Sequence, residues 1–510
     1  MKHPNKLHLF LTVFLLILVG FLVSEKINLF TADLGRHIKN GEMILSGNFS
    51  SVLSTNFYSY TYPDFPFVNH HWGSGVVFCL VHRFLSFIGL SIFFVLVIVS
   101  TFWLFFDTAK KNSNFTVTFF SSILFLPLIV YRREIRPEIF SYFFCALFWW
   151  ILSGVKNKRI AEKWLFILPA AQIIWINLHV YFFWGFILTG LFLMESYFEN
   201  KVFFKKLLVI FGFLFLTSLV NPAGYKGLFY PLNIFKDYGY RVLENQTVLF
   251  IDRVFGKYPP NLYFKIAFTA LLVSWVLALK KKNVSIINFC LFLLVSYLGW
   301  SAIRNFTVFA FFGLGIMAEN INNIDFLKFR QKEKEIFVNI SLGVFALFIL
   351  FILDSHYWLA RNLGWGVDKN TQTAINFFRQ NNLEGPIFNN YDIGGYLIYY
   401  LFPNEKVFVD NRPEAYPTEF FTDTYVPMQE NQTIWEEVDQ KYGFNAVFFY
   451  RNDLTPWGHQ FLVAMIQNSQ WAPVFVDQNS IIFLKRNELN QPIIKKFELP
   501  KEMFQIKKAD

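Results

Sequence analysis

Charged residues are scarce in this chain. Asp, Glu, Lys and Arg make up 16% of its 510 residues, whereas a soluble domain carries about 25%. Hydrophobic residues make up 54% and aromatic residues 21%, with 68 phenylalanines. The composition therefore excludes an ordinary soluble globular protein and indicates a chain that lies largely in a lipid bilayer.

Cysteines and the common catalytic motifs are also missing or few. The three cysteines, Cys79, Cys145 and Cys290, lie in or beside apolar runs. They exclude a disulfide framework and a thiolate metal site, and buried thiols are expected. The sequence has no P-loop, GxSxG, HExxH or GxGxxG motif. The net charge of +10 comes without a basic, aromatic-interleaved soluble patch, so nucleic acid is not an expected partner.

Apolar runs of roughly 15–20 residues or more recur, and each is long enough to cross a bilayer core as a helix. They predict a polytopic α-helical membrane protein of about 11 spans. The predicted spans are 7–24, 74–106, 113–131, 137–155, 160–176, 181–198, 206–220, 262–279, 284–300, 303–318 and 335–353. The second run is too long for one perpendicular helix, so a re-entrant or interfacial piece is expected near 74–87. The first run is too long for a signal peptide and has no small-residue cleavage site, which favours an uncleaved span.

Basic residues gather in alternate loops between these spans. They are Lys2, Lys6, Lys110, Lys111, Lys156, Lys158, Arg159, Lys163, Lys201, Lys205, Lys206, Lys280, Lys281, Lys282, Lys328, Arg330, Lys332 and Lys334. By the positive-inside rule, these loops and the N-terminus are cytoplasmic. The first outer loop, 25–73, and everything after residue 353 are then extracytoplasmic.

Two domains are expected, a transmembrane domain at 1–353 and a soluble extracytoplasmic α/β domain at 354–510. In the second, the pattern predicts helices at NTQTAINFFRQNN, GGYLIYYLF, TIWEEVDQKYG and HQFLVAMIQNS, and strands at GPIFNN, KVFVDNR and AVFFYR. WAPVFVDQ and SIIFLKR, joined across Asn479, predict a terminal hairpin. The alternation favours a largely parallel sheet. Asp410 and Arg412 follow a predicted strand, where ligands bind in open α/β sheets; they can also simply pair with each other.

The first outer loop concentrates titratable groups in a chain that has few of them. Asp33 comes just after the first span and begins a predicted interfacial helix, DLGRHIKNGEMIL. A carboxylate there can act as general base for an acceptor hydroxyl, or ligate a divalent cation, Mg²⁺ or Mn²⁺, that neutralises a phosphate leaving group. The alternative is that Asp33 only caps the helix.

His70, His71 and Trp72 lie at the end of this loop. Adjacent histidines cannot both point the same way, so a two-histidine metal clamp is not expected. One imidazole can bind a phosphate or orient Asp33, and Trp72 offers a surface for stacking on a sugar. The alternative is that these residues are interfacial anchors.

Arg132, Arg133 and Arg136, in RREIRPE, lie at a predicted outer membrane boundary, against the positive-inside bias. Guanidinium groups bind phosphate bidentately, although Arg–Glu pairs at the turn before Pro137 are a structural alternative. Arg304 and His179 lie at other outer helix ends, where polar groups usually face the bundle interior. Arg304 is a second candidate for an anionic headgroup and His179 a candidate for substrate binding. Helix capping is the expected role of two further residues, Asn177 and Asn221.

Several strings carry a family resemblance that covers nearly the whole chain. They are DLGRHIKNGE, FYSYTYPDFPFVNHHWGS, RREIRPEIFSYFF, INLHVYFFWG, NPAGYKGLFYPL, IRNFTVFAFFGLGI and, in the tail, FNNYDIGGYLIYYLFPNEKVFVDNRPEAY. With the acidic first outer loop and the C-terminal outer domain, they resemble the GT-C superfamily of membrane glycosyltransferases. The likeness is greatest to the bacterial branch related to dolichyl-phosphate-mannose–protein mannosyltransferases. The chain departs from these patterns in two ways: Asp33 is followed by Leu34 instead of an adjacent acid, and the WWDxG signature is absent.

The resemblance implies an irregular helical bundle in a bacterial inner membrane, with Asp33 as catalytic base or metal contact. It also implies a donor sugar on a polyprenyl phosphate and an extracytoplasmic acceptor, which is a glycan, a lipid or a protein. Since the sequence offers one convincing carboxylate, the expected transfer is a single inverting displacement, eased by cations placed beforehand. Three alternatives are a transporter of lipid-linked saccharides, an enzyme like the O-antigen ligases or polymerases, and an inactive scaffold.

Overall fold

The computed structural model describes residues 6–31, 33–280, 284–322, 343 and 361–504. The chain divides into two compact units. The helical unit comprises Met1–Lys26, Ser91–Pro231 and Arg241–Trp365, and the mixed unit comprises Ile27–Leu90, Leu232–Tyr240 and Gly366–Asp510. The first outer loop and the C-terminal segment thus belong to the same unit. The expected domain boundary at 353/354 lies outside the described residues and stays a prediction.

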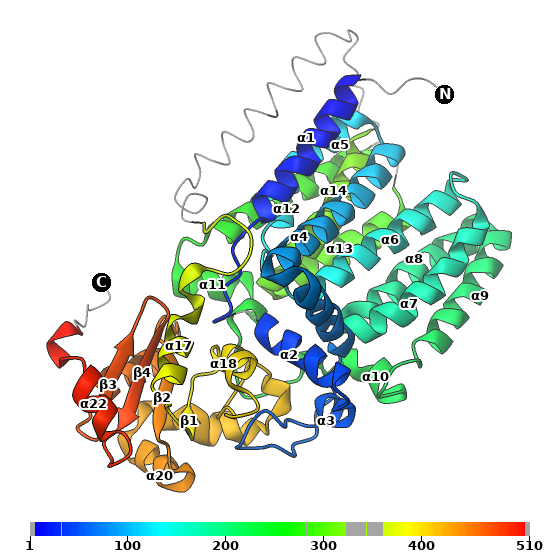
Figure 1. The fold of residues 1–510 in the computed structure, drawn as a ribbon. Coiled ribbons are helices and arrows are strands. Elements are labelled where there is room, and N and C mark those ends of the chain that lie inside the picture. The colour runs from blue at the N-terminus through cyan, green and yellow to red at the C-terminus, as the bar shows by residue number, and fades with distance from the viewer. Residues whose placement is uncertain (1–5, 32, 281–283, 323–342, 344–360, 505–510) are drawn as a thin grey trace. The chain divides into compact units, whose positions relative to one another are not determined.

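The helical unit is a bundle of apolar helices (Figure 1). Its main helices are α1 (Lys6–Val23), α5 (Phe115–Ile129), α6 (Glu138–Lys156), α7 (Ile167–Leu178), α8 (Phe183–Glu199), α9 (Lys201–Thr217), α11 (Val248–Phe255), α12 (Pro259–Lys280), α13 (Ile286–Ser301) and α14 (Phe306–Asn322). Helix α14 packs against α5, α12 and α13, and α8 packs against α6 and α9. A Cβ on Gly313 would lie 2.7 Å from the Phe125 ring. Small residues at such contacts let membrane helices approach closely.

Among the described residues, five helices are long and apolar enough to cross a membrane. They are Lys6–Val23, Trp72–Asn112, Glu138–Lys156, Val180–Glu199 and Pro259–Lys280. Every span predicted before residue 320 coincides with a helix, and the last, 335–353, lies outside the described residues. The structure is therefore that of a multi-pass membrane protein.

Helix α4 (Trp72–Asn112) confirms the break expected in the second hydrophobic run. Its backbone leaves the helical region at Ser86, where φ is 58° and ψ is −167°. A left-handed φ is costly for a residue with a Cβ. The kink separates a first piece, which belongs to the mixed unit, from the apolar remainder.

The mixed unit joins the first outer loop to the C-terminal segment. The loop forms α2 (Leu34–Leu45) and α3 (Phe49–Ser54). The C-terminal helices are α17 (Thr373–Gln380), α18 (Gly394–Leu401), α19 (Pro427–Glu430), α20 (Gln432–Tyr442), α21 (Pro456–Gln467) and α22 (Gln491–Phe497). Its strands are β1 (Ile387–Phe388), β2 (Ala446–Tyr450), β3 (Trp471–Val476) and β4 (Ser480–Lys485), in the order β1-β2-β4-β3.

Two expectations for this sheet need correction. The sheet is mixed and not largely parallel, since only β1 and β2 pair in parallel among its described strands, whereas β4 runs antiparallel to both β2 and β3. The terminal hairpin is confirmed. The second correction concerns the segment KVFVDNR, which is not a strand of this sheet. Its backbone hydrogen-bonds to the first outer loop instead: Val407 N donates to Tyr58 O and Tyr60 N donates to Val407 O, each at 3.1 Å. Phe408 O accepts from the hydroxyls of Ser59 and Thr61.

Candidate active site

Asp33 stands at the N-terminus of α2, as the sequence predicts, but it does not cap that helix. Its backbone is already helical, with φ −66° and ψ −4°, and its side chain makes no capping hydrogen bond among the described residues. An N-cap residue instead has extended backbone that aims its side chain at the first amides. The capping alternative is therefore wrong.

The Asp33 carboxylate is held by side chains within the mixed unit. Asn411 Nδ2 donates to Asp33 Oδ1. Arg36 Nε donates to Asn411 Oδ1 at 3.2 Å, and Arg36 Nη2 lies 3.8 Å from Asp33 Oδ2. Asp33, Arg36 and Asn411 thus form a closed triangle, which we call the Asp33 clamp. The Asp33 side chain is 22% exposed and Arg36 only 4%.

Close packing of α2 on α18 sets the position of this clamp. A Cβ on Gly35 would lie 2.9 Å from both Gly395 O and Tyr399 Cβ. Only glycine allows two helix backbones to approach so closely. The first two turns of α2, from Leu34 to Gly41, are buried on all sides.

The turn that carries Asn411 is braced by its two neighbours. Arg412 binds Asp410 bidentately, at 2.7 and 2.6 Å, and donates to Asn56 Oδ1 at 2.6 Å. Asp410 is fully buried and Arg412 is 2% exposed. The expectation that these two residues pair with each other is confirmed. A buried bidentate pair is rigid, so the turn presents Asn411 in one orientation.

A second carboxyl group borders this region. Burial raises the pKa of Glu414, and Asp410 adds to that rise, while Arg36 and Arg412 act against it. Burial also raises the pKa of Tyr391 well above its ordinary value, and the nearby Glu414 and Asp33 contribute. Glu414 is therefore an acidic neighbour of the clamp that the sequence did not single out.

The rings of His70 and His71 lie against each other, with centroids 3.9 Å apart, although adjacent histidines were expected to point in different directions. The His71 ring meets the His37 ring edge-on, with centroids 5.6 Å apart, and the His70 Nδ1 lies 3.2 Å from Val68 O. His37 is one helical turn after Asp33, so His71 lies near the clamp. Trp72 begins α4 and packs edge-on against Phe49, with centroids 5.9 Å apart. The roles of His70, His71 and Trp72 in substrate binding stay predictions.

Three of the four predicted arginines come together in the helical unit, around two carboxylates. Arg132 binds Glu138 at 2.5 Å and Glu244 at 2.7 Å. Arg136 lies 3.4 Å from Glu244, and Arg304 lies 3.7 Å from it. We call these residues (Arg132, Arg136, Arg304, Glu138 and Glu244) the arginine cluster. The Arg–Glu pairing expected around Pro137 is confirmed.

Electrostatics within the arginine cluster favour the charged forms. Burial by itself raises the pKa of Glu244, but Arg132, Arg136 and Arg304 outweigh it and hold the pKa well below its usual range. Arg136 also binds Glu134 at 2.7 Å, so three guanidinium groups face three carboxylates and the charges balance. Arg132 Nη2 and Arg304 Nε are buried donors without a hydrogen-bond partner in the described part of the chain. An unmet buried donor is costly, so an anion would be stabilised there.

The fourth arginine lies apart from this cluster. Arg133 Nε binds Glu25 at 3.1 Å, and Arg361 Nη2 lies 3.9 Å from the same carboxylate. Glu25 and Glu244 were not singled out in the sequence. No local pattern marks them, because their arginine partners in these two groups are far from them along the chain: Arg133 and Arg361 for Glu25, and Arg132, Arg136 and Arg304 for Glu244.

His179 is buried inside the helical unit. Its Nδ1 lies 2.7 Å from Ser141 Oγ, which also accepts from Trp175 Nε1 at 2.8 Å. This network ties α6 to the end of α7, and substrate binding by His179 stays a prediction. Asn177 and Asn221 donate to backbone carbonyls near helix ends, but His179, Ser218 and Gly224 occupy the cap positions there, so their expected capping role stays a prediction.

Asp33 is also the candidate ligand for a divalent cation. The described residues bring together no group of three or more His, Cys, Asp or Glu side chains that could hold a metal ion. The neighbours of the Asp33 carboxylate are an amide donor and a guanidinium group. Both act as donors in this structure, although the amide oxygen of an Asn side chain also ligates hard cations, so binding of Mg²⁺ or Mn²⁺ at Asp33 stays a prediction.

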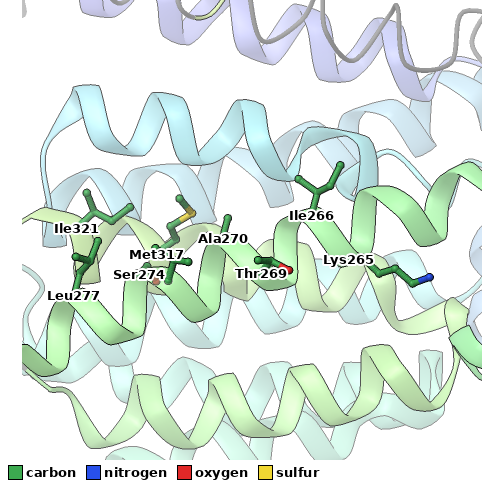
Figure 2. A pocket seen from close by; sticks show the side chains of 9 residues that line it. Lys265, Ile266, Thr269, Ala270, Ser274, Leu277, Met317 and Ile321 are labelled. Atoms are coloured by element: carbon green, nitrogen blue, oxygen red, sulfur yellow. The ribbon is translucent and has the colours of Figure 1, made fainter.

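An open apolar groove runs along α12 and α14 in the helical unit, with a volume of about 540 Å³ (Figure 2). Its lining residues are Lys265, Ile266, Thr269, Ala270, Val273, Ser274, Leu277, Met317 and Ile321. Lys265 stands at one end and binds Asp252 at 2.5 Å. The groove therefore combines a hydrophobic length with a single cation.

No family model and no curated protein sequence matches the chain. Solved structures do match. ArnT from Cupriavidus metallidurans in the apo state has a TM-score of 0.55 at 13% identity, with 93% of this chain and 97% of that one covered. ArnT bound to undecaprenyl phosphate has a TM-score of 0.51 at 13% identity and 94% and 98% coverage. The Archaeoglobus fulgidus oligosaccharyltransferase, in complex with Zn and sulfate, has a TM-score of 0.53 at 12% identity and 93% and 73% coverage. The chain therefore has the fold of the GT-C membrane glycosyltransferases.

Proposed function

We propose that the protein is a membrane glycosyltransferase that moves a sugar from a polyprenyl-phosphate donor to an extracytoplasmic acceptor, which is a glycan, a lipid or a protein. The fold supports this, and one structure with that fold is bound to undecaprenyl phosphate. The observation that carries the proposal is the Asp33 clamp: a carboxylate at the start of the first extramembrane loop, oriented by two side chains and not used as a helix cap.

Asp33 acts as the general base in this proposal. It accepts the proton of the acceptor hydroxyl as that oxygen attacks the anomeric carbon of the donor sugar. The bond from the anomeric carbon to the phosphate oxygen breaks, and polyprenyl phosphate leaves with the bonding electrons. One displacement inverts the anomeric configuration. A positioned base contributes about 10²–10⁴-fold to such a step.

The arginine cluster binds the donor phosphate, and Arg133, which pairs with Glu25 apart from the cluster, is a separate candidate contact of the donor. Arg132 and Arg304 keep unmet buried donors, and guanidinium groups suit phosphate oxygens. Positive charge placed before the reaction stabilises the leaving phosphate as its charge grows. The groove along α12 and α14 is the candidate site for the apolar tail of the donor. His71 and Trp72 are the candidates to contact sugar or phosphate near the clamp. Ligation of a divalent cation by Asp33 is the alternative to its role as base.

The basic loops support an orientation in which the N-terminus is cytoplasmic and the mixed unit extracytoplasmic. The reaction then occurs at the outer face of a bacterial inner membrane.

Asp33→Asn tests the function. The variant keeps the shape of the side chain and removes the base, so transfer in proteoliposomes supplied with polyprenyl-phosphate sugars should fall by about 10²-fold or more. Folding and donor binding should be unchanged. Asp64→Asn is the matched control, since Asp64 is an exposed carboxylate in the same loop. Full activity of Asp33→Asn, or saccharide translocation that ignores the substitution, would refute the proposal in favour of a carrier.

A further inference from the structure

The Asp33 clamp draws one of its three members from the far end of the chain. Asn411 lies 378 positions from Asp33, and its side chain is hydrogen-bonded to both other members. It donates to the Asp33 carboxylate through Nδ2 and accepts from Arg36 through Oδ1. An amide can do both at once, because it carries a donor and an acceptor on one rigid plane.

We propose that Asn411 is a positioning residue for Asp33, so that the C-terminal segment completes the catalytic centre. This inference rests on the proposed function of Asp33 as base. The turn at 410–412 is rigid, because the buried Asp410–Arg412 pair holds the backbone on both sides of Asn411. Asn411 itself is only half-buried and contributes little to that brace.

Asn411 also controls how Arg36 and Asp33 meet. The two are three residues apart on α2, a spacing at which a carboxylate and a guanidinium can pair closely. Their nearest charged atoms nevertheless lie 3.8 Å apart, because Arg36 Nε is bound to Asn411. Without Asn411, Arg36 is free to close on Asp33 and occupy the lone pairs that the acceptor hydroxyl needs. Asn411 therefore keeps the base both oriented and available.

Asn411→Asp is the most informative single variant. It preserves size and the acceptor for Arg36, removes the donor to Asp33, and sets a carboxylate against a carboxylate. The turnover number kcat should fall by about 10- to 100-fold, the scale of a hydrogen bond to a charged group. The donor KM should stay unchanged, because a positioning role assigns Asn411 to Asp33 and Arg36 and not to the donor. Asn452→Asp is the control, since Asn452 is exposed and only donates to a backbone carbonyl.

The double variant Asp33→Asn with Asn411→Asp separates positioning from folding. It exchanges the amide and the carboxylate and so restores an amide–carboxylate hydrogen bond at the same place. Its thermal stability should return toward that of the parent protein, while transfer should stay at the level of Asp33→Asn. Recovery of transfer by the exchange would show that only packing matters at this site and would overturn the inference.

The failures of the two proposals are distinguishable. If Asp33→Asn keeps full transfer, the proposed base is wrong whatever Asn411 does. If Asp33→Asn loses transfer but Asn411→Asp keeps kcat at the level of the Asn452→Asp control, only the positioning inference fails. The inference is also overturned if Asn411→Asp merely yields less folded protein, so that kcat calculated per folded molecule equals that of the parent protein.

Discussion

Glu244→Gln should destabilise the helical unit by a measurable amount at neutral pH. Glu244 is the carboxylate that the three arginines of the cluster share, with Arg132 at 2.7 Å, Arg136 at 3.4 Å and Arg304 at 3.7 Å. Its side chain is 17% exposed, so water screens it poorly. Removing one partner of a buried ion pair costs about 3–5 kcal/mol. Because glutamine keeps the shape and an acceptor oxygen, we expect about 3 kcal/mol.

The size of this effect on melting follows from chain length. Entropy of unfolding grows with the number of residues, so for a unit of this size each kcal/mol corresponds to roughly 1–2 °C. Thermal unfolding of the detergent-solubilised protein at pH 7 should therefore shift down by about 3–6 °C. Glu199→Gln is the control, because Glu199 is 57% exposed and lies 3.5 Å from Lys156. Exposed pairs of this kind contribute about 0–1 kcal/mol.

The pH dependence gives the sharper test. The folded-state pKa of Glu244 is lowered by its arginine neighbours, and the unfolded value is about 4.3. A carboxyl group with a depressed folded pKa contributes stability that is fully present above the unfolded pKa and is lost as pH falls through the folded pKa. The difference between the parent protein and Glu244→Gln should thus be constant from about pH 7 to pH 5.5 and shrink below about pH 4.5. Equal melting at pH 7, or a difference that persists at the acid end, would refute the reasoning.

Three further substitutions test other parts of the structure. Arg304→Gln should raise the donor KM by about 10-fold or more, because it removes a charged donor from the proposed phosphate site; transfer kinetics against donor concentration measure it. Ala270→Trp should also raise the donor KM and leave the acceptor KM unchanged, since it fills the groove along α12 and α14. Gly35→Ala should lower both melting temperature and transfer, because its Cβ would lie 2.9 Å from Gly395 O and α2 would have to move.

Each of these has a matched control in the same class of position. Arg253→Gln removes an exposed arginine near the end of α11 and should leave the donor KM unchanged. Leu272→Trp adds the same bulk to an exposed position of α12 that does not line the groove. Gly212→Ala adds a Cβ that meets nothing within 4 Å, so it should leave melting unchanged or raise it. A test variant that behaves like its control contradicts the corresponding assignment.

The sequence predicted the helices of the membrane region well. An apolar run of sufficient length has one stable form in lipid, a helix that satisfies its own backbone groups, so the spans predicted before residue 320 coincide with helices. The break in α4 was predictable from length, and its position at Ser86 agrees with the expected end of the first piece near residue 87. The hairpin of β3 and β4 followed from local alternation and a short turn.

The sheet topology was less predictable, for a physical reason. KVFVDNR has the composition of a strand, but composition does not specify a partner. Its backbone groups are bound by residues 58–61 of the first outer loop, about 350 positions away. The alternation of helices and strands led to the prediction of a largely parallel sheet. In the structure β4 lies between β2 and β3 and is antiparallel to both, so the sheet is mixed.

For the candidate site, the sequence by itself determined which residue types carry the chemistry. Asp33 and the arginines of RREIRPE and SAIRNF stood out because charge is rare in this chain and costly at a membrane boundary. Only the tertiary structure decided which of them meet. In the tertiary structure the Asp33 side chain binds Asn411 and does not cap its own helix. Arg304 lies with Arg132 and Arg136 around Glu244. Arg133 pairs with Glu25. Ion pairs and hydrogen bonds between side chains depend on positions in space, so they cannot be read from the residues adjacent in the sequence.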